Sequence, residues 1–116
     1  MKTSEIIQKQ ITENPVIIYM KGIPEMPQCG FSGNAINALR STGLPFAYIN
    51  VLENTRIFQG LPEFSDWPTF PQVFIGGELV GGGDDVAEMA RDGSLKPAME
   101  SALNTVNNNT NAGAAQ

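Results

Sequence analysis

Cys29 is the only cysteine of this 116-residue chain, and it lies in the stretch PQCGFSG at 27–33. Two thiols three residues apart are typical of proteins that form a redox-active internal disulfide. Here Ser32 occupies the second position, and a hydroxyl can donate or accept a hydrogen bond but cannot close a disulfide. Any sulfur that pairs with Cys29 must therefore come from another molecule.

The position of Cys29 along the chain favours a reactive thiol. A loop with Pro24 and Pro27 precedes it, and apolar residues at helical spacing follow it, so Cys29 is expected at a helix N-terminus. The macrodipole and the amides of a helix start favour an anion and lower the pKa of a thiol. A buried structural cysteine is the alternative, but such a cysteine does not need the flanking Pro27 and Gly30.

The apolar pattern predicts helices and strands that position this loop. Helices are expected at 4–14, from Cys29 to Gly43, and at 54–64, 85–92 and 94–103, and strands at 16–20, 46–51 and, as a hairpin around Gly76 and Gly77, within 72–80. Gly60 and Pro62 make the third helix weak or broken. A parallel pair with a crossover helix, followed by a hairpin, indicates an α/β fold with a mixed four-stranded sheet flanked by helices.

Length and composition favour one domain at 1–103, followed by a flexible Asn-rich tail at 104–116. The net charge of −5 and the seven scattered basic residues argue against nucleic-acid binding. The longest apolar run, at 16–20, is too short to cross a membrane. The amino terminus lacks the apolar region of a secretory signal, and a lone cysteine suits the reducing cytoplasm.

Three motifs resemble those of the monothiol glutaredoxins: MKG at 20–22, CGFS at 29–32, and WPTFPQVFIGGELVGG at 67–82 with an aspartate after it. The likeness extends over 5–103 and is to the short bacterial single-domain form. It implies the thioredoxin fold, which agrees with the order of elements expected above.

The resemblance also implies a glutathione site beside the cysteine. In the family, the residues that correspond to Lys21, Thr69, Phe70 and Pro71 hold glutathione, and Pro71 would be the cis-proline of the fold. A cation at Lys21 would also lower the pKa of Cys29. Taken alone, however, Lys21 is compatible with a surface lysine and Phe70 with a core aromatic.

The glycines at 81–83 suggest a second part of that site. Successive glycine amides at a helix start can bind an anion, here the γ-glutamyl carboxylate of glutathione. Gly83 is part of this run, and Asp84 would face the ammonium group of the same ligand. A flexible turn, with Asp84 or Asp85 as the helix cap, is compatible with the same residues.

Two positions depart from the family pattern. Members commonly have a cysteine where Gly83 stands, so a second nearby sulfur is also missing there. Many have an arginine at the position of Phe58, which contacts the glycine carboxylate of glutathione. Here Arg56 lies two residues earlier, on another face of the expected helix. We therefore expect that contact to be lost and glutathione affinity to be lowered.

The function that the resemblance implies is transport of a [2Fe-2S] cluster. Such a cluster takes four ligands, usually thiolates, and the family pattern implies Cys29 from each of two chains and two glutathiones in a cluster-bridged homodimer. A BolA-like protein and apo iron-sulfur proteins are the implied partners. Two alternatives stay open: a glutathione-dependent thiol-disulfide oxidoreductase with Cys29 as nucleophile, and an interaction module without redox work.

Overall fold

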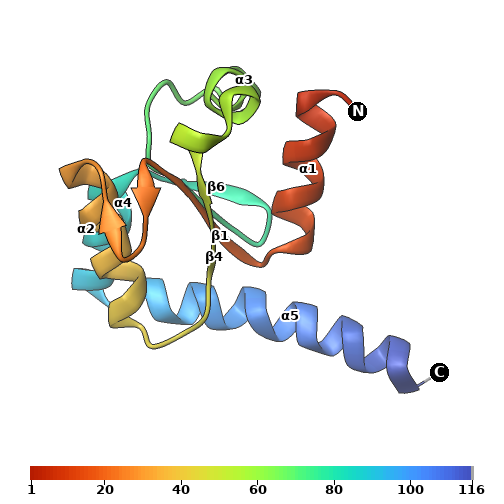
Figure 1. Ribbon diagram of the computed structural model, residues 1–116. Coiled ribbons are helices and arrows are strands. Elements are labelled where there is room, and N and C mark those ends of the chain that lie inside the picture. Colours follow the sequence, from red (N-terminus) through yellow and green to blue (C-terminus); the bar gives the residue numbers. More distant parts are fainter. Residues whose placement is uncertain (116) are drawn as a thin grey trace.

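The computed structural model describes the backbone of residues 1–115 and the side chains of residues 1–105 (Figure 1). The chain alternates between helices and strands, as expected. In chain order the elements are α1 (Thr3–Glu13), β1 (Val16–Met20), β2 (Gly22–Ile23), β3 (Met26–Pro27), α2 (Gly30–Ser41), β4 (Ala47–Asn50), the 3-10 turn η1 (Val51–Glu53), α3 (Thr55–Ser65), β5 (Gln72–Ile75), β6 (Glu78–Gly81), α4 (Gly83–Asp92) and α5 (Leu95–Ala115).

Four strands form one mixed sheet in the order β4-β1-β5-β6. Strand β1 runs parallel to β4 and antiparallel to β5, and β5 and β6 form the hairpin predicted around Gly76 and Gly77. All five residues of β1 are buried, as is typical of a strand covered on both faces. The predicted α/β fold with a mixed four-stranded sheet flanked by helices is therefore confirmed.

Alternate residues of β1 face two separate hydrophobic cores. Val16, Ile18 and Met20 pack in the core formed with α2, α4 and α5, whereas Ile17 and Tyr19 pack in the core formed with α1 and α3. Figure 1 shows α1 and α3 on one side of the sheet and the other three helices on the opposite side. Because side chains of a strand alternate between its faces, one short apolar strand anchors both layers.

The prediction that the helix at 54–64 is weak or broken was wrong, because α3 is continuous through Gly60 and Pro62. Ile57 and Leu61 are buried and anchor this helix to the sheet. Gly60 lies against α1, where an added Cβ would come within 2.8 Å of Thr3 Cγ2. Glycine thus permits the close approach of the two helices, and packing outweighs the low helix propensity.

Two element boundaries and one short ribbon also differ from the sequence expectation. Strand β4 ends at Asn50, whose side chain accepts a hydrogen bond from the Leu52 amide (3.1 Å) and so starts η1. Helix α4 begins at Gly83, two residues before the expected start. The short strands β2 and β3 pair into a ribbon just before Cys29 that was not predicted.

Helix α5 begins after Ser94 as expected, and its backbone continues to Ala115. The predicted flexible tail at 104–116 falls mostly on residues whose side chains lie outside the described part of the structure, so it stays a prediction. Although α5 is the longest helix of the described chain, neither it nor any other helix there combines the length and apolar character needed to cross a membrane.

Candidate functional site

Cys29 is the N-cap residue of α2, as the sequence predicted. Its backbone is extended, with φ −151° and ψ 156°, and its Sγ accepts a hydrogen bond from the Ser32 amide at 3.3 Å. The side chain is only partly buried. The ribbon of β2 and β3 ends just before Cys29 and α2 begins just after it, so two regular elements fix the position of the sulfur.

Ser32 connects this sulfur to the end of β1. Its side chain is fully buried, and its Oγ accepts a hydrogen bond from the Lys21 amide at 3.1 Å and lies 3.2 Å from Cys29 Sγ. Because the Lys21 amide occupies an Oγ lone pair, the hydroxyl proton is free to point toward the sulfur. The residue that replaces the second thiol is therefore a hydrogen-bond link between the sheet and Cys29.

The surroundings of Cys29 lower its pKa below the ordinary thiol value. Burial raises the pKa, but the hydrogen bonds from the Ser32 hydroxyl and amide, the charge of Lys21 and the Phe31 amide together outweigh burial. The thiolate is the form that attacks disulfides and binds metals. Partial exposure together with a lowered pKa is typical of a reactive cysteine rather than a structural one.

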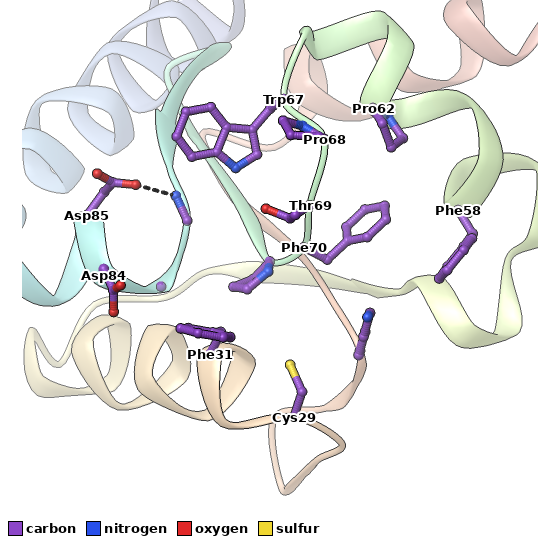
Figure 2. Close-up of a pocket in the computed structure, with 14 residues that line it drawn as sticks. Cys29, Phe31, Phe58, Pro62, Trp67, Pro68, Thr69, Phe70, Asp84 and Asp85 are labelled. Carbon is purple, nitrogen blue, oxygen red and sulfur yellow. Dashed lines mark hydrogen bonds between the residues drawn. The ribbon is translucent and has the colours of Figure 1, made fainter.

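Cys29 opens into a groove of about 590 Å³ (Figure 2). Its walls come from the start of α2, the end of β1, helix α3, the loop before β5, and the turn between β6 and α4. All the site residues predicted from the sequence line this groove: Lys21, Cys29, Phe58, Thr69, Phe70, Pro71, Gly83 and Asp84. Motifs that are far apart in the chain thus meet around one thiol.

The loop before β5 is held in place by a residue that the sequence analysis did not single out, Gln72. Its side chain is fully buried, and its Nε2 donates hydrogen bonds to the carbonyl oxygens of Trp67 (2.9 Å) and Thr69 (3.2 Å). The peptide between Phe70 and Pro71 is cis, as predicted. The only signal for Gln72 in the sequence is a polar residue at the start of an apolar strand.

The turn between β6 and α4 differs in part from the predicted anion site. The Gly82 amide donates a hydrogen bond to the Asp85 carboxylate at 2.9 Å (Figure 2), so this amide is not free to bind a ligand. Asp85 is therefore the capping residue, and Asp84 stays exposed at the groove. The first amides of α4, beginning at Gly83, have no acceptor within the helix and are oriented toward its N-terminal end.

Gly83 marks a close contact between α2 and α4. A Cβ at this position would clash with the carbonyl oxygen of Phe31 and would lie 3.1 Å from its carbonyl carbon. In this structure, the position where family members commonly have cysteine therefore has no room for a side chain unless the backbone around Phe31 shifts. Gly30, the first residue of α2, has open space where its Cβ would be.

Phe58, rather than Arg56, faces the groove from α3. The Phe58 ring stacks on Phe70, with ring centroids 5.5 Å apart and an interplanar angle of 29° (Figure 2). Arg56 instead donates hydrogen bonds to Thr3 Oγ1 at 3.2 Å and to the carbonyl oxygen of Met1 at 2.6 Å. The guanidinium group is thus held at the start of α1, away from the groove.

The described residues contain no group of three or more His, Cys, Asp or Glu side chains arranged to hold a metal ion. Cys29 is also the only cysteine in the sequence. The chain therefore offers a single thiolate to a metal at this site.

Comparisons with known proteins show the family of the chain. Residues 16–80 match the family model for glutaredoxin. The chain is 52% identical over 94 residues to glutaredoxin 4 of Escherichia coli (strain K12), covering 81% of this chain and 82% of that protein. It is 52% identical over 87 residues to the probable monothiol glutaredoxin GrlA of Legionella pneumophila (strain Philadelphia 1), covering 75% and 98%.

A solved structure supports the same relationship. The crystal structure of a buckwheat glutaredoxin-glutathione complex matches with a TM-score of 0.75 and 26% sequence identity, over 86% of this chain and 89% of that chain. The predicted thioredoxin fold is therefore confirmed. With a lone cysteine in the CGFS motif and these matches over most of its length, the chain belongs to the glutaredoxin family and is similar to its short bacterial monothiol members.

Proposed function

We propose that this glutaredoxin carries and transfers a [2Fe-2S] cluster, with Cys29 as the protein ligand. The observation that carries the proposal is an activated thiol without a partner. Cys29 is partly exposed and has a lowered pKa, yet Ser32 and Gly83 stand where a second sulfur would resolve a disulfide. Such a thiolate is better suited to bind a shared metal cluster than to complete a dithiol redox cycle alone.

The number of ligands explains why other molecules are needed. A [2Fe-2S] cluster takes four ligands, usually thiolates, and each chain supplies one. Two chains and two glutathione thiolates would complete the set, which gives a homodimer bridged by the cluster. Because half of this ligand set is exchangeable, the cluster can pass to apo iron-sulfur proteins.

The groove has features that suit glutathione. Lys21 provides a cation beside the thiol, and the first amides of α4 at Gly83 would attract the γ-glutamyl carboxylate. Asp84 is exposed at the same place and would pair with the ligand's ammonium group. The buckwheat relative, which shares the fold, was solved as a glutathione complex.

The proposed partners follow from the same chemistry. A second copy of the chain shares the cluster, and a BolA-like protein would replace that copy in a heterodimer before delivery to apo iron-sulfur proteins. We propose no role in binding nucleic acid or membranes, given the net charge of −5. A reducing compartment such as the cytoplasm would keep Cys29 available as a thiolate.

A glutathione-dependent oxidoreductase is the second candidate, and the lowered pKa of Cys29 favours it. The thiolate would attack the glutathione sulfur of a mixed disulfide, and the other thiol would leave. A second glutathione thiolate would then attack the Cys29 disulfide, which releases oxidised glutathione and restores the Cys29 thiolate. This route depends on glutathione from solution, since the chain has no other cysteine.

Purification without oxygen and in the presence of glutathione separates the two candidates. We expect the wild type to be a coloured dimer with two irons per dimer, and Cys29→Ser to be colourless and monomeric. Ser41→Ala, at the far end of α2, is the matched control and should keep the cluster.

Retention of the cluster by Cys29→Ser would show that the ligand assignment is wrong. If the wild type instead binds no iron but rapidly reduces a glutathione mixed disulfide in a reaction that needs Cys29, the oxidoreductase function is favoured.

A further inference from the structure

Phe58 and Phe70 form an aromatic pair inside the groove. Phe58 is 40% exposed even though its ring stacks on Phe70. Pro62, one helical turn further along α3, lines the same wall (Figure 2). An accessible apolar surface within a groove is suited to bind an uncharged part of a ligand.

Helix α3 brings no cation to this pair. Among the described residues that line the groove, Lys21 is the only cation, and the anions Asp84 and Asp85 lie at the other end (Figure 2). Arg56, the cation nearest to Phe58 along α3, is bonded to the start of α1. A carboxylate placed on the two rings would lose hydration without gaining a cationic partner from α3.

The arrangement of the groove determines which end of a peptide thiol reaches the pair. Cys29 lies between α4, with Asp84, and α3, with Phe58 (Figure 2). A γ-glutamyl-cysteinyl peptide whose sulfur lies at Cys29 and whose γ-glutamyl group lies at α4 therefore extends its carboxyl-terminal end toward Phe58. At that end, an amide or an ester can pack on the rings.

We propose that Phe58 and Phe70 form a specificity subsite that favours glutathione-like ligands whose carboxyl-terminal end is uncharged. The inference rests on the proposed function, because it assumes that a γ-glutamyl-cysteinyl peptide occupies the groove. Beyond the proposed function, this chain selects its thiol ligand by an apolar contact of the ligand's carboxyl-terminal end with α3. Phe58 is then a specificity residue and takes no part in the chemistry at sulfur.

Binding of two synthetic peptides tests the subsite. S-methyl glutathione and S-methyl glutathione amide differ only at the terminal carboxyl group, and neither can form a disulfide. NMR titration of the metal-free protein gives a Kd for each. We expect the wild type to bind the amide more tightly than the acid.

Phe58→Arg should reverse this order. We expect the arginine to tighten binding of the acid about tenfold, the effect of one added hydrogen bond between charged groups, and to change binding of the amide by less than about twofold. Leu52→Arg is the matched control, because Leu52 is 51% exposed and is not among the described residues that line the groove. It adds the same charge and should leave the ratio of the two Kd values unchanged.

Equal binding of the two peptides by the wild type, or tighter binding of the acid, would overturn the inference. Equal shifts of the ratio in Phe58→Arg and Leu52→Arg would overturn it as well. If the Phe58→Arg variant folds poorly, the ratio of the two Kd values of the wild type is sufficient to test the inference. A wild type that binds neither peptide would contradict the glutathione-dependent function itself, and the subsite with it.

Discussion

Helices α2 and α4 both begin at the groove, but their N-termini differ in how they interact with negative charge. At α2 the N-cap residue is Cys29, whose sulfur accepts the hydrogen bond of the Ser32 amide. At α4 the Asp85 carboxylate accepts the hydrogen bond of the Gly82 amide. The amides of the first turn of α4 have no acceptor within the helix. The first helix start therefore activates a group of the protein, whereas we expect the second to hold a group of the ligand.

The first residue of each helix is a glycine, and the two glycines have different surroundings. Gly83 lies against the Phe31 backbone, whereas Gly30 has open space. We expect Gly83→Ala to lower the free energy of unfolding by about 1–3 kcal/mol, as overpacking does, which is a larger loss than we expect from Ser32→Ala or Asp85→Ala.

Gly30→Ala is the matched control, and it should change the free energy of unfolding by less than about 0.5 kcal/mol. Urea unfolding of both variants measures the difference. Equal losses would mean that the contact between α2 and α4 does not require a glycine.

Ser32→Ala tests how the start of α2 activates the thiol. The substitution leaves the partly buried Lys21 amide without its acceptor, so the free energy of unfolding should fall by about 1–2 kcal/mol. It also removes the Ser32 hydroxyl bond, which opposes the effect of burial and lowers the pKa of Cys29. The pKa should therefore rise, and the thiolate fraction at neutral pH should fall.

The rate of Cys29 alkylation as a function of pH measures this change. The wild-type midpoint should lie below the ordinary thiol value, and the Ser32→Ala midpoint should lie above that of the wild type. Ser41→Ala serves as the control, because Ser41 Oγ donates to the Ala38 carbonyl at the other end of α2. An unchanged midpoint in Ser32→Ala would exclude the hydroxyl as a source of the lowered pKa.

The smallest effect on the free energy of unfolding is expected at the start of α4. Asp84 and Asp85 both lie in the first turn and both interact favourably with the helix dipole, but Asp85 alone accepts the Gly82 amide. Asp85→Ala should therefore lower the free energy of unfolding by about 1 kcal/mol more than Asp84→Ala does. Thermal unfolding compares the two, and equal losses would mean that the capping bond adds nothing to stability.

Local sequence signals were sufficient to predict most of the fold. The apolar run at 16–20 gave the central strand, and Gly76 with Gly77 gave the hairpin. The ribbon of β2 and β3 could not be predicted, because two-residue strands are too short to show a periodic pattern. The continuity of α3 depends on contact with α1 at Gly60, and propensity alone does not contain that information.

Most of the predicted site residues meet in the groove because they belong to motifs beside the end of a strand or helix, whereas Phe58 reaches it from within α3. What the sequence did not reveal depends on distances between remote segments. The contact of Gly83 with Phe31 and the stacking of Phe58 on Phe70 each join residues from different elements. Likewise, the spacing of residues gives no sign that the Gln72 side chain turns inward to hold a loop.

Native mass spectrometry of the holoprotein, prepared without oxygen, tests most directly whether one Cys29 thiolate and one glutathione per chain hold the cluster. We predict a dimer whose mass exceeds that of two chains by one [2Fe-2S] cluster and two glutathione molecules. A monomer that retains the cluster, or a dimer that retains it without glutathione, would contradict the proposed ligand set.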